Sequence, residues 1–304
     1  MKEFLLRYRS ILLIFMAYAA ASKVAHTLLY TLVSSWVLMT SQDQTGFSDL
    51  VNEIASQFVF AAYAAAALLL ALAIWLGDKA LYSHRPFWNT RAPWRLDRQT
   101  KSEFGGGFGS GFLIAAVLLA ILLAGGYISY LGLFLTSTVG TPVFPLFFSD
   151  LVALMVFVVC EEFLFRHKIL PRLLEFRGSH AAVWGTAFLY VGLKQFQFQL
   201  VALDFLNLML LNLTLGYYYL KSGKAHRGLG LAAALFGTLH AVAGMPLWSQ
   251  TSPSLFLFKH NLRASDLMSG GAAGPMASLG MTLFLFLALA TGYRRWRRDN
   301  PNFL

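Results

Sequence analysis

Long apolar runs constrain the fold of this chain more than any other feature. A membrane-spanning helix needs about 20 mainly apolar residues, whereas a soluble domain carries about 25% charged residues. Here 57% of the 304 residues are apolar and only 12% are charged. The sequence therefore predicts an all-α fold, a polytopic bundle of membrane helices, rather than a soluble domain or a β-barrel.

Eight apolar segments are predicted to span the membrane, and the charges between them alternate. Basic residues precede the first segment and follow the second, fourth, sixth and eighth, while most other connections are acidic or neutral. Because Lys and Arg stay on the cytoplasmic side, both termini are predicted inside. The exception is the 247–274 connection, which is placed outside although it carries Lys259 and Arg263. The segments are 10–40, 55–77, 111–136, 147–174, 179–195, 200–220, 228–246 and 275–293.

Three parts of the chain are predicted from this pattern. Residues 1–146 hold the N-terminal spans and a basic cytoplasmic loop at 78–104, and residues 147–246 form a core. Residues 247–304 hold an outer loop, the last span and a basic tail. The net charge of +10 is attributed to cytoplasmic loops that meet anionic lipids, and not to nucleic-acid binding. A multi-pass protein of a plasma membrane, such as the bacterial inner membrane, is predicted.

Two stretches before the core could be mistaken for other features or processed differently. "ILLIFMAYAAAS" resembles the apolar region and cleavage site of a signal peptide, so cleavage of the first span is an alternative. "FGGGFGSG" at 104–111 is interpreted as a flexible lead into the third span. It is not a phosphate-binding loop, because no Lys-Ser/Thr pair follows it.

The stretch "VVCEEFLFRHK" places Glu161 and Glu162 late in the fourth apolar segment. An ionisable group inside a bilayer costs several kcal/mol unless it is paired, so it predicts a functional site. Glu162 and Arg166 are four residues apart and share a helix face, where they can pair. Glu161 lies about 100° away and can face the bundle interior. In the alternative, the span ends at Cys160 and both acids lie in water.

Three further polar residues are predicted near the depth of Glu161. Counting from the inner helix ends places Lys194, His240 and Asn207 about 20–24 Å into the bundle. An acid, an amine and an imidazole from separate helices are thus predicted to meet, either as a reactive site or as a structural polar cluster. No metal or cofactor is predicted, since no His-Glu-x-x-His motif occurs. The lone Cys160 is expected to pack without reacting.

The string "EEFLFR" matches the EExxxR signature of the CPBP family, so residues 147–246 resemble these intramembrane glutamic proteases. The family includes CAAX prenyl endopeptidases and Abi-type bacteriocin-processing proteins. The family's Phe-x-x-x-His motif corresponds to "TAFLYVGLKQF", which gives Tyr190 and Lys194. Its His-x-x-x-Asn motif corresponds to "LFGTLHAVAGM", which gives His240 and Gly244. Phe236 and His240 also fit the second motif, but their order along the chain favours the third.

The resemblance implies roles for these residues and also questions them. It implies that Glu161 activates a water, that Glu162 and Arg166 support it, and that His240 donates to the oxyanion or leaving group. It implies contacts with the substrate at Tyr190, Asn207 and Gly244. However, Lys194 replaces a histidine that can accept a proton, and an ion pair with it would make Glu161 a poorer base. Gly244 replaces an asparagine and supplies no side-chain donor.

The implied activity is hydrolysis of a peptide bond in a membrane-embedded or lipid-linked substrate. A catalytically degenerate relative that acts as a membrane scaffold or regulator is the alternative, which the two departures favour. A transporter is a further alternative, but no internal repeat is found and the glycine pair at 125–126 is only a weak interruption.

Overall fold

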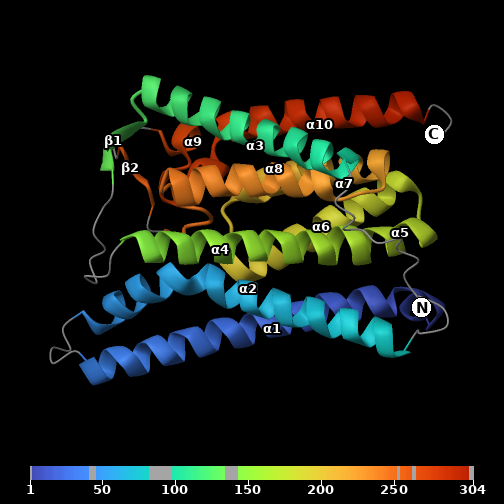
Figure 1. Ribbon diagram of the computed structural model, residues 1–304, viewed down its shortest axis with the longest axis horizontal. Helices are drawn as coiled ribbons and strands as arrows, with labels where there is room; N and C mark the ends of the chain where they lie inside the picture. Colours follow the sequence, from blue (N-terminus) through green and yellow to red (C-terminus); the bar gives the residue numbers. More distant parts are fainter. Residues whose placement is uncertain are drawn as a thin grey trace.

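The helices of this chain run along one long axis and bring both termini to the same end (Figure 1). The structure is a computed structural model that describes residues 2–40, 46–81, 98–133, 143–251, 254–261 and 265–300. Its α-helices are α1 (Lys2–Thr40), α2 (Phe47–Leu81), α3 (Arg98–Ala124), α4 (Val143–Glu162), α5 (Leu170–Phe176), α6 (Ser179–Phe198), α7 (Ala202–Ser222), α8 (His226–Phe236), α9 (Asp266–Ser269) and α10 (Leu279–Asp299).

Shorter elements connect these helices. Two π-helical segments, η1 (Phe163–Ile169) and η2 (Gly237–Val242), continue α4 and α8 respectively. The 3-10 turns η3 (Gly271–Ala273) and η4 (Pro275–Ala277) precede α10. The strands β1 (Ile128–Leu133) and β2 (Phe256–His260) pair antiparallel, with Ile128 opposite His260.

The predicted helical membrane fold is confirmed, because each of the eight predicted segments overlaps a helix. Within the described part of the chain, four helical stretches have the length and hydropathy of a membrane span: Tyr8–Thr40, Phe47–Leu76, Arg98–Ala124 and Phe144–Phe176. Large apolar side chains on the outer helices, such as Met16 and Phe286, are exposed, as a lipid-facing surface requires. The number of eight crossings stays a prediction.

The third predicted span is wrong at both ends. The segment that was expected to be a flexible lead, 104–111, is helical, and the helix ends at Ala124 instead of near 136. Gly126 follows with a φ of +70°, a conformation that glycine adopts readily, and the chain then enters β1. The glycine pair therefore ends the helix. Of the predicted basic loop, 98–104 belongs to α3, while 82–97 lies outside the described residues.

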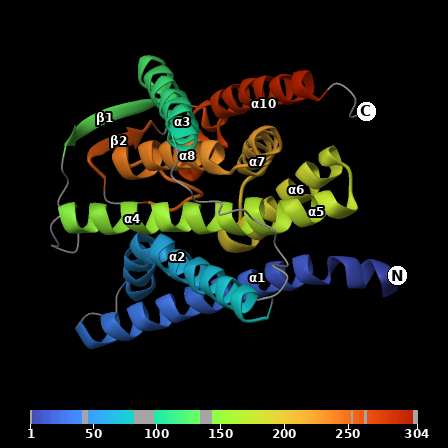
Figure 2. The same ribbon diagram turned by 45° about the vertical axis from the view of Figure 1, so that its right-hand side comes forward.

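Glycines in α3 are explained by its close contact with α8. A Cβ atom on Gly107 would lie 2.0 Å from the carbonyl oxygen of Arg227, and one on Gly111 would lie 2.3 Å from that of Leu231. Small residues four apart let two membrane helices approach backbone to backbone. These glycines thus hold α3 against α8, on the opposite side of α8 from α4 in Figure 2.

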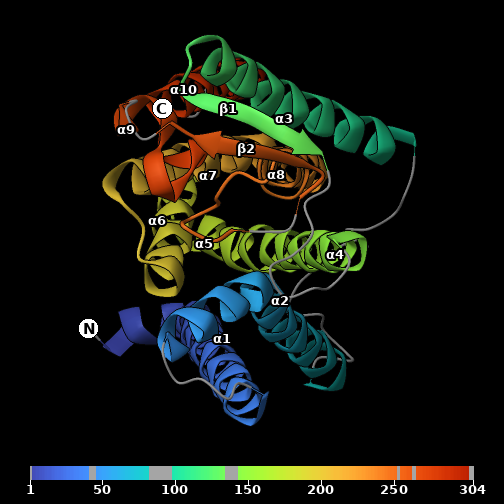
Figure 3. The same cartoon turned by 90° about the vertical axis from the view of Figure 1, so that its left-hand side faces the viewer.

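The bundle is layered. The α1–α2 pair packs on α4 through α2, α4 packs on α8, and α7 packs on both α6 and α10. The β1–β2 sheet lies at the end opposite the termini (Figure 1), and Figure 3 looks onto this end. The predicted outer loop 247–274 folds back onto this end, where Trp248 is 1% exposed. One apolar core includes residues from Ile11 to Trp296 and joins all three predicted parts.

Candidate active site

The fourth predicted span is one continuous helical rod through both acids. It runs from α4 through η1 into α5, and Glu161 and Glu162 are 2% and 3% exposed. The alternative in which the span ends at Cys160 and the acids lie in water is therefore wrong. The switch to π-helix begins directly after Glu162. Such π-helical insertions widen a helix locally and occur often at functional sites.

Glu161 accepts hydrogen bonds from three side chains on two other helices. The Lys194 ammonium on α6 lies 2.8 Å from each carboxylate oxygen. The hydroxyl of Tyr190, one turn earlier on α6, donates to Oε2 at 2.9 Å, and the hydroxyl of Tyr18 on α1 donates to Oε1 at 2.9 Å. Of the two groups predicted to meet Glu161, Lys194 contacts it. The three donors give both carboxylate oxygens hydrogen-bond partners in the interior of the bundle.

Aromatic rings surround the Lys194 ammonium, which is completely buried. Its nitrogen lies 3.7 Å from the ring centre of Phe157 and 4.7 Å from that of Trp248. The rings of Tyr190 and Phe198 lie at 5.2 Å and 5.3 Å. Ring faces attract a cation and replace part of its lost hydration. The Lys194 side chain therefore lies between Glu161 and four aromatic rings.

Glu162 is neutralised by Arg166, as their spacing predicts. The Arg166 Nε lies 3.7 Å from Glu162 Oε2, and both side chains are buried. Arg166 also donates from Nη2 to the Asn212 side-chain oxygen at 2.6 Å, which ties η1 to α7. Glu162 and Arg166 thus fix the helix that carries Glu161, and we describe them as positioning residues.

His240 joins a second acid and not Glu161. Its Nε2 lies 3.4 Å from Asp150 Oδ2, and its Nδ1 lies 3.3 Å from the Met245 carbonyl oxygen. Asp150 precedes Glu161 by eleven residues, which is about 16 Å along α4. The Phe60 ring packs edge-on against His240 at 4.9 Å and lies 6.1 Å from the Trp248 ring. Aromatic rings therefore connect the His240–Asp150 pair to the Glu161–Lys194 pair.

Asn207 and Gly244, the other two predicted substrate contacts, have structural roles in the fold. The Asn207 amide nitrogen donates to the carbonyl oxygens of Met276 and Ser278, at 2.6 Å and 3.1 Å, and so anchors α7 to the start of α10. Gly244 has a φ of +65°, and a Cβ atom there would lie 2.1 Å from the Ser254 hydroxyl oxygen. The family's asparagine is absent at this position because no side chain fits.

Sequence reasoning missed Tyr18 and Asp150. Tyr18 is 143 residues from Glu161, and no local pattern connects them. Asp150 was visible as a lone acid in an apolar run, which is the same signal that singled out Glu161. The described residues contain no group of three His, Cys, Asp or Glu side chains that could hold a metal ion.

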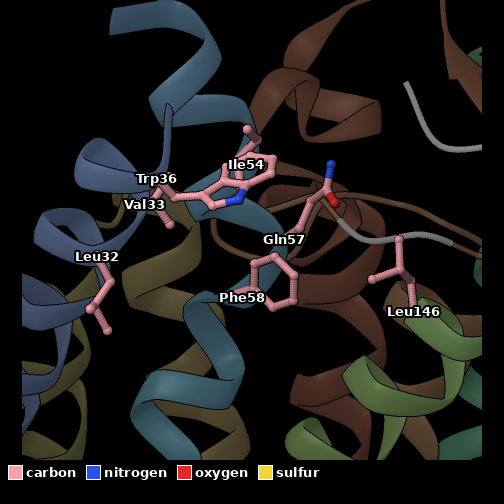
Figure 4. A pocket seen from close by; sticks show the side chains of 7 residues that line it. All are labelled: Leu32, Val33, Trp36, Ile54, Gln57, Phe58 and Leu146. Carbon is pink, nitrogen blue, oxygen red and sulfur yellow. The ribbon is translucent and has the colours of Figure 1, made fainter. Parts of the chain in front are cut away.

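An apolar pocket of about 380 Å³ lies elsewhere, between α1, α2 and the start of α4 (Figure 4). Trp36, Phe58 and Leu146 line it, with Gln57 as a polar group. Leu146 precedes Glu161 by fifteen residues, about 22 Å along the helix. The pocket is therefore remote from the Glu161 carboxylate.

These features define a class: a helical membrane protein with a buried carboxylate on a π-distorted span, held by three donors from two other helices. The family described as "Type II CAAX prenyl endopeptidase Rce1-like" matches residues 141–226. Over this segment, which includes Glu161, Arg166 and Lys194, the chain is similar to CAAX-type proteases. The match ends before His240 and Gly244. Neither a curated protein nor a solved structure matches the chain.

Proposed function

We propose that this chain is an intramembrane endopeptidase in which Glu161 activates a water to hydrolyse a peptide bond of a membrane-embedded or lipid-linked substrate. The family match suggests a CAAX-type protease, and the observation that carries the finer proposal is the buried Glu161 carboxylate with its three donors. Once Lys194 leaves Glu161, this buried carboxylate is the group that can take a proton from water beside a peptide bond.

The proposed reaction needs Lys194 to move from Glu161 to the substrate. Glu161 takes a proton from water, and the resulting hydroxide attacks the carbonyl carbon of the peptide bond. The Lys194 ammonium then stabilises the oxyanion. When the carbon–nitrogen bond breaks, Glu161 returns its proton to the leaving amine. Without substrate, Lys194 stays on Glu161 and holds the site inactive.

The test is cleavage by the purified chain in liposomes. Candidate substrates are a prenylated CAAX peptide, the same peptide without its lipid, and a reporter with one membrane span. We expect Glu161→Gln and Glu161→Ala to lower the rate by about 10²–10⁴. Glu175→Gln is the matched control, because Glu175 on α5 carries the same charge but is half exposed and pairs with Arg172.

Three outcomes would contradict the proposal. Cleavage that persists in Glu161→Gln would remove Glu161 from the chemistry. Binding of a substrate by the wild-type chain without any cleavage would favour a degenerate relative that acts as a scaffold, and solute flux into the liposomes would favour a transporter.

A further inference from the structure

A polar pocket lies among helix ends, at the end of the bundle where both termini lie (Figure 1). Its volume is about 230 Å³, which is below the usual 300–1,000 Å³ of pockets for drug-sized ligands. Residues from the start of α3, the end of α7, the start of α8 and the end of α10 form its wall. They include Gln99, Glu103, Tyr218, Lys221, Arg227 and Arg295.

The lining has more positive than negative charge. Three cations, Lys221, Arg227 and Arg295, face one acid, Glu103. Lys221 is held 3.2 Å from Asp299 Oδ2, so the two arginines are the cations that remain for a ligand. The Arg227 guanidinium lies 4.8 Å from the Tyr218 ring centre, which fixes its position. Its buried Nε has no hydrogen-bond acceptor among the described residues.

Glu103 indicates a second property of the ligand, a hydrogen-bond donor. Glu103 Oε1 accepts a hydrogen bond from the Gln99 side-chain nitrogen at 3.2 Å. Its Oε2 is buried and has no donor within the described part of the chain. A ligand that completes the pocket therefore brings an anionic group for the arginines and a hydrogen-bond donor for Glu103.

We infer that the pocket binds the headgroup of an anionic phospholipid. The phosphate lies between Arg227 and Arg295, and a hydroxyl of the headgroup donates to Glu103. The position supports a lipid over a free phosphate compound, because helix ends with clustered arginines are at headgroup depth on the predicted cytoplasmic side. Basic pockets between membrane helices on that side recognise lipid phosphates.

The test measures lipid binding to the purified full chain by native mass spectrometry in a neutral detergent. Three lipids with the same acyl chains are compared: phosphatidylglycerol, phosphatidylmethanol and phosphatidylcholine. Phosphatidylmethanol keeps the phosphate charge and lacks the hydroxyls. We expect affinity to fall in the order given. Arg295→Gln should weaken phosphatidylglycerol binding about fivefold, and Glu103→Ala should abolish the preference for phosphatidylglycerol over phosphatidylmethanol.

Arg298→Gln is the matched control, since Arg298 lies three residues further along α10 with a side chain that is 78% exposed. If both arginine variants weaken binding equally, only general surface attraction acts and the inference fails. Equal binding of all three lipids also overturns it. Glycerol 3-phosphate is the last arm: displacement of the lipid by this soluble ligand at equal concentration would show a site for a free phosphate compound instead.

Discussion

At the scale of single residues, Lys194 determines how Glu161 can behave. A carboxylate that accepts hydrogen bonds from an ammonium and two phenols is a weaker proton acceptor, so the proposed reaction requires Lys194 to leave Glu161. The stabilisation belongs to the Glu161–Lys194 ion pair as a whole and cannot be assigned to either residue alone. Removing one partner of a buried ion pair costs about 3–5 kcal/mol, whereas replacing both is often neutral.

A double-mutant cycle tests this pairing. We expect Lys194→Met to lower the free energy of unfolding by about 3–5 kcal/mol, because Glu161 is left as a buried, uncompensated charge. Combining Lys194→Met with Glu161→Gln should restore most of that loss. Unfolding with SDS in mixed micelles measures all four proteins. Additive losses would mean that the two side chains do not stabilise one another.

Replacing Lys194 by the family's histidine tests the catalytic role of the same position. We expect Lys194→His to raise the rate of peptide cleavage at least tenfold, because a neutral imidazole can share the proton of the attacking water and frees Glu161 from the ion pair. Cleavage assays in liposomes provide the measurement. Lys224→His, in the connection between α7 and α8, is the control and should leave the rate unchanged. A lower rate in Lys194→His would assign the donor role to lysine itself.

At the scale of elements, one member of each buried acid–base pair lies beside or within a π-helical segment. η1 begins directly after Glu162, and η2 contains His240. The site is built where α4 and α8 depart from regular geometry, and both helices are held by closer neighbours: α2 packs on α4, and α3 packs on α8. The α3–α8 contact is the tighter one, because it depends on glycine.

Substitution of Gly107 tests that contact. Gly107→Ala should destabilise the protein by about 1–3 kcal/mol, because the new Cβ would lie 2.0 Å from the Arg227 carbonyl oxygen. Gly109→Ala, in the same helix with open space around it, should be neutral or stabilise by up to about 1 kcal/mol. The melting temperatures of the two variants in detergent provide the comparison. Equal shifts would show that α3 does not depend on close approach.

The sequence predicts the elements better than it predicts what joins them. Helix positions follow from apolar length, and the Glu162–Arg166 pair follows from four-residue spacing. The end of α3 was missed because glycines such as those at 125–126 can either end a helix or be tolerated within it. The surrounding structure decides which of the two occurs. Tyr18 and the Asp150–His240 pair depend on which helices become neighbours, and apolar periodicity contains no such information.

At the scale of the whole molecule, the common end of the two termini agrees with an even number of crossings (Figure 1). The charge pattern predicts that this end is cytoplasmic, with the end of α1, the start of α2 and the β1–β2 sheet on the other side. Lys259 in β2 is the main exception to the pattern, so the sheet is the region where orientation most needs a measurement.

Single cysteines in a Cys160→Ala background test the orientation, since Cys160 is the only cysteine. Ser48 at the start of α2, Lys259 in β2 and Arg298 near the end of α10 are all exposed. In right-side-out vesicles we expect an impermeant maleimide to label Ser48→Cys and Lys259→Cys at once, and Arg298→Cys only after permeabilisation. If Lys259→Cys is labelled only after permeabilisation, like Arg298→Cys, the β1–β2 sheet lies inside. The chain between Ser48 and Lys259 would then cross the membrane an odd number of times, and not the even number that is predicted.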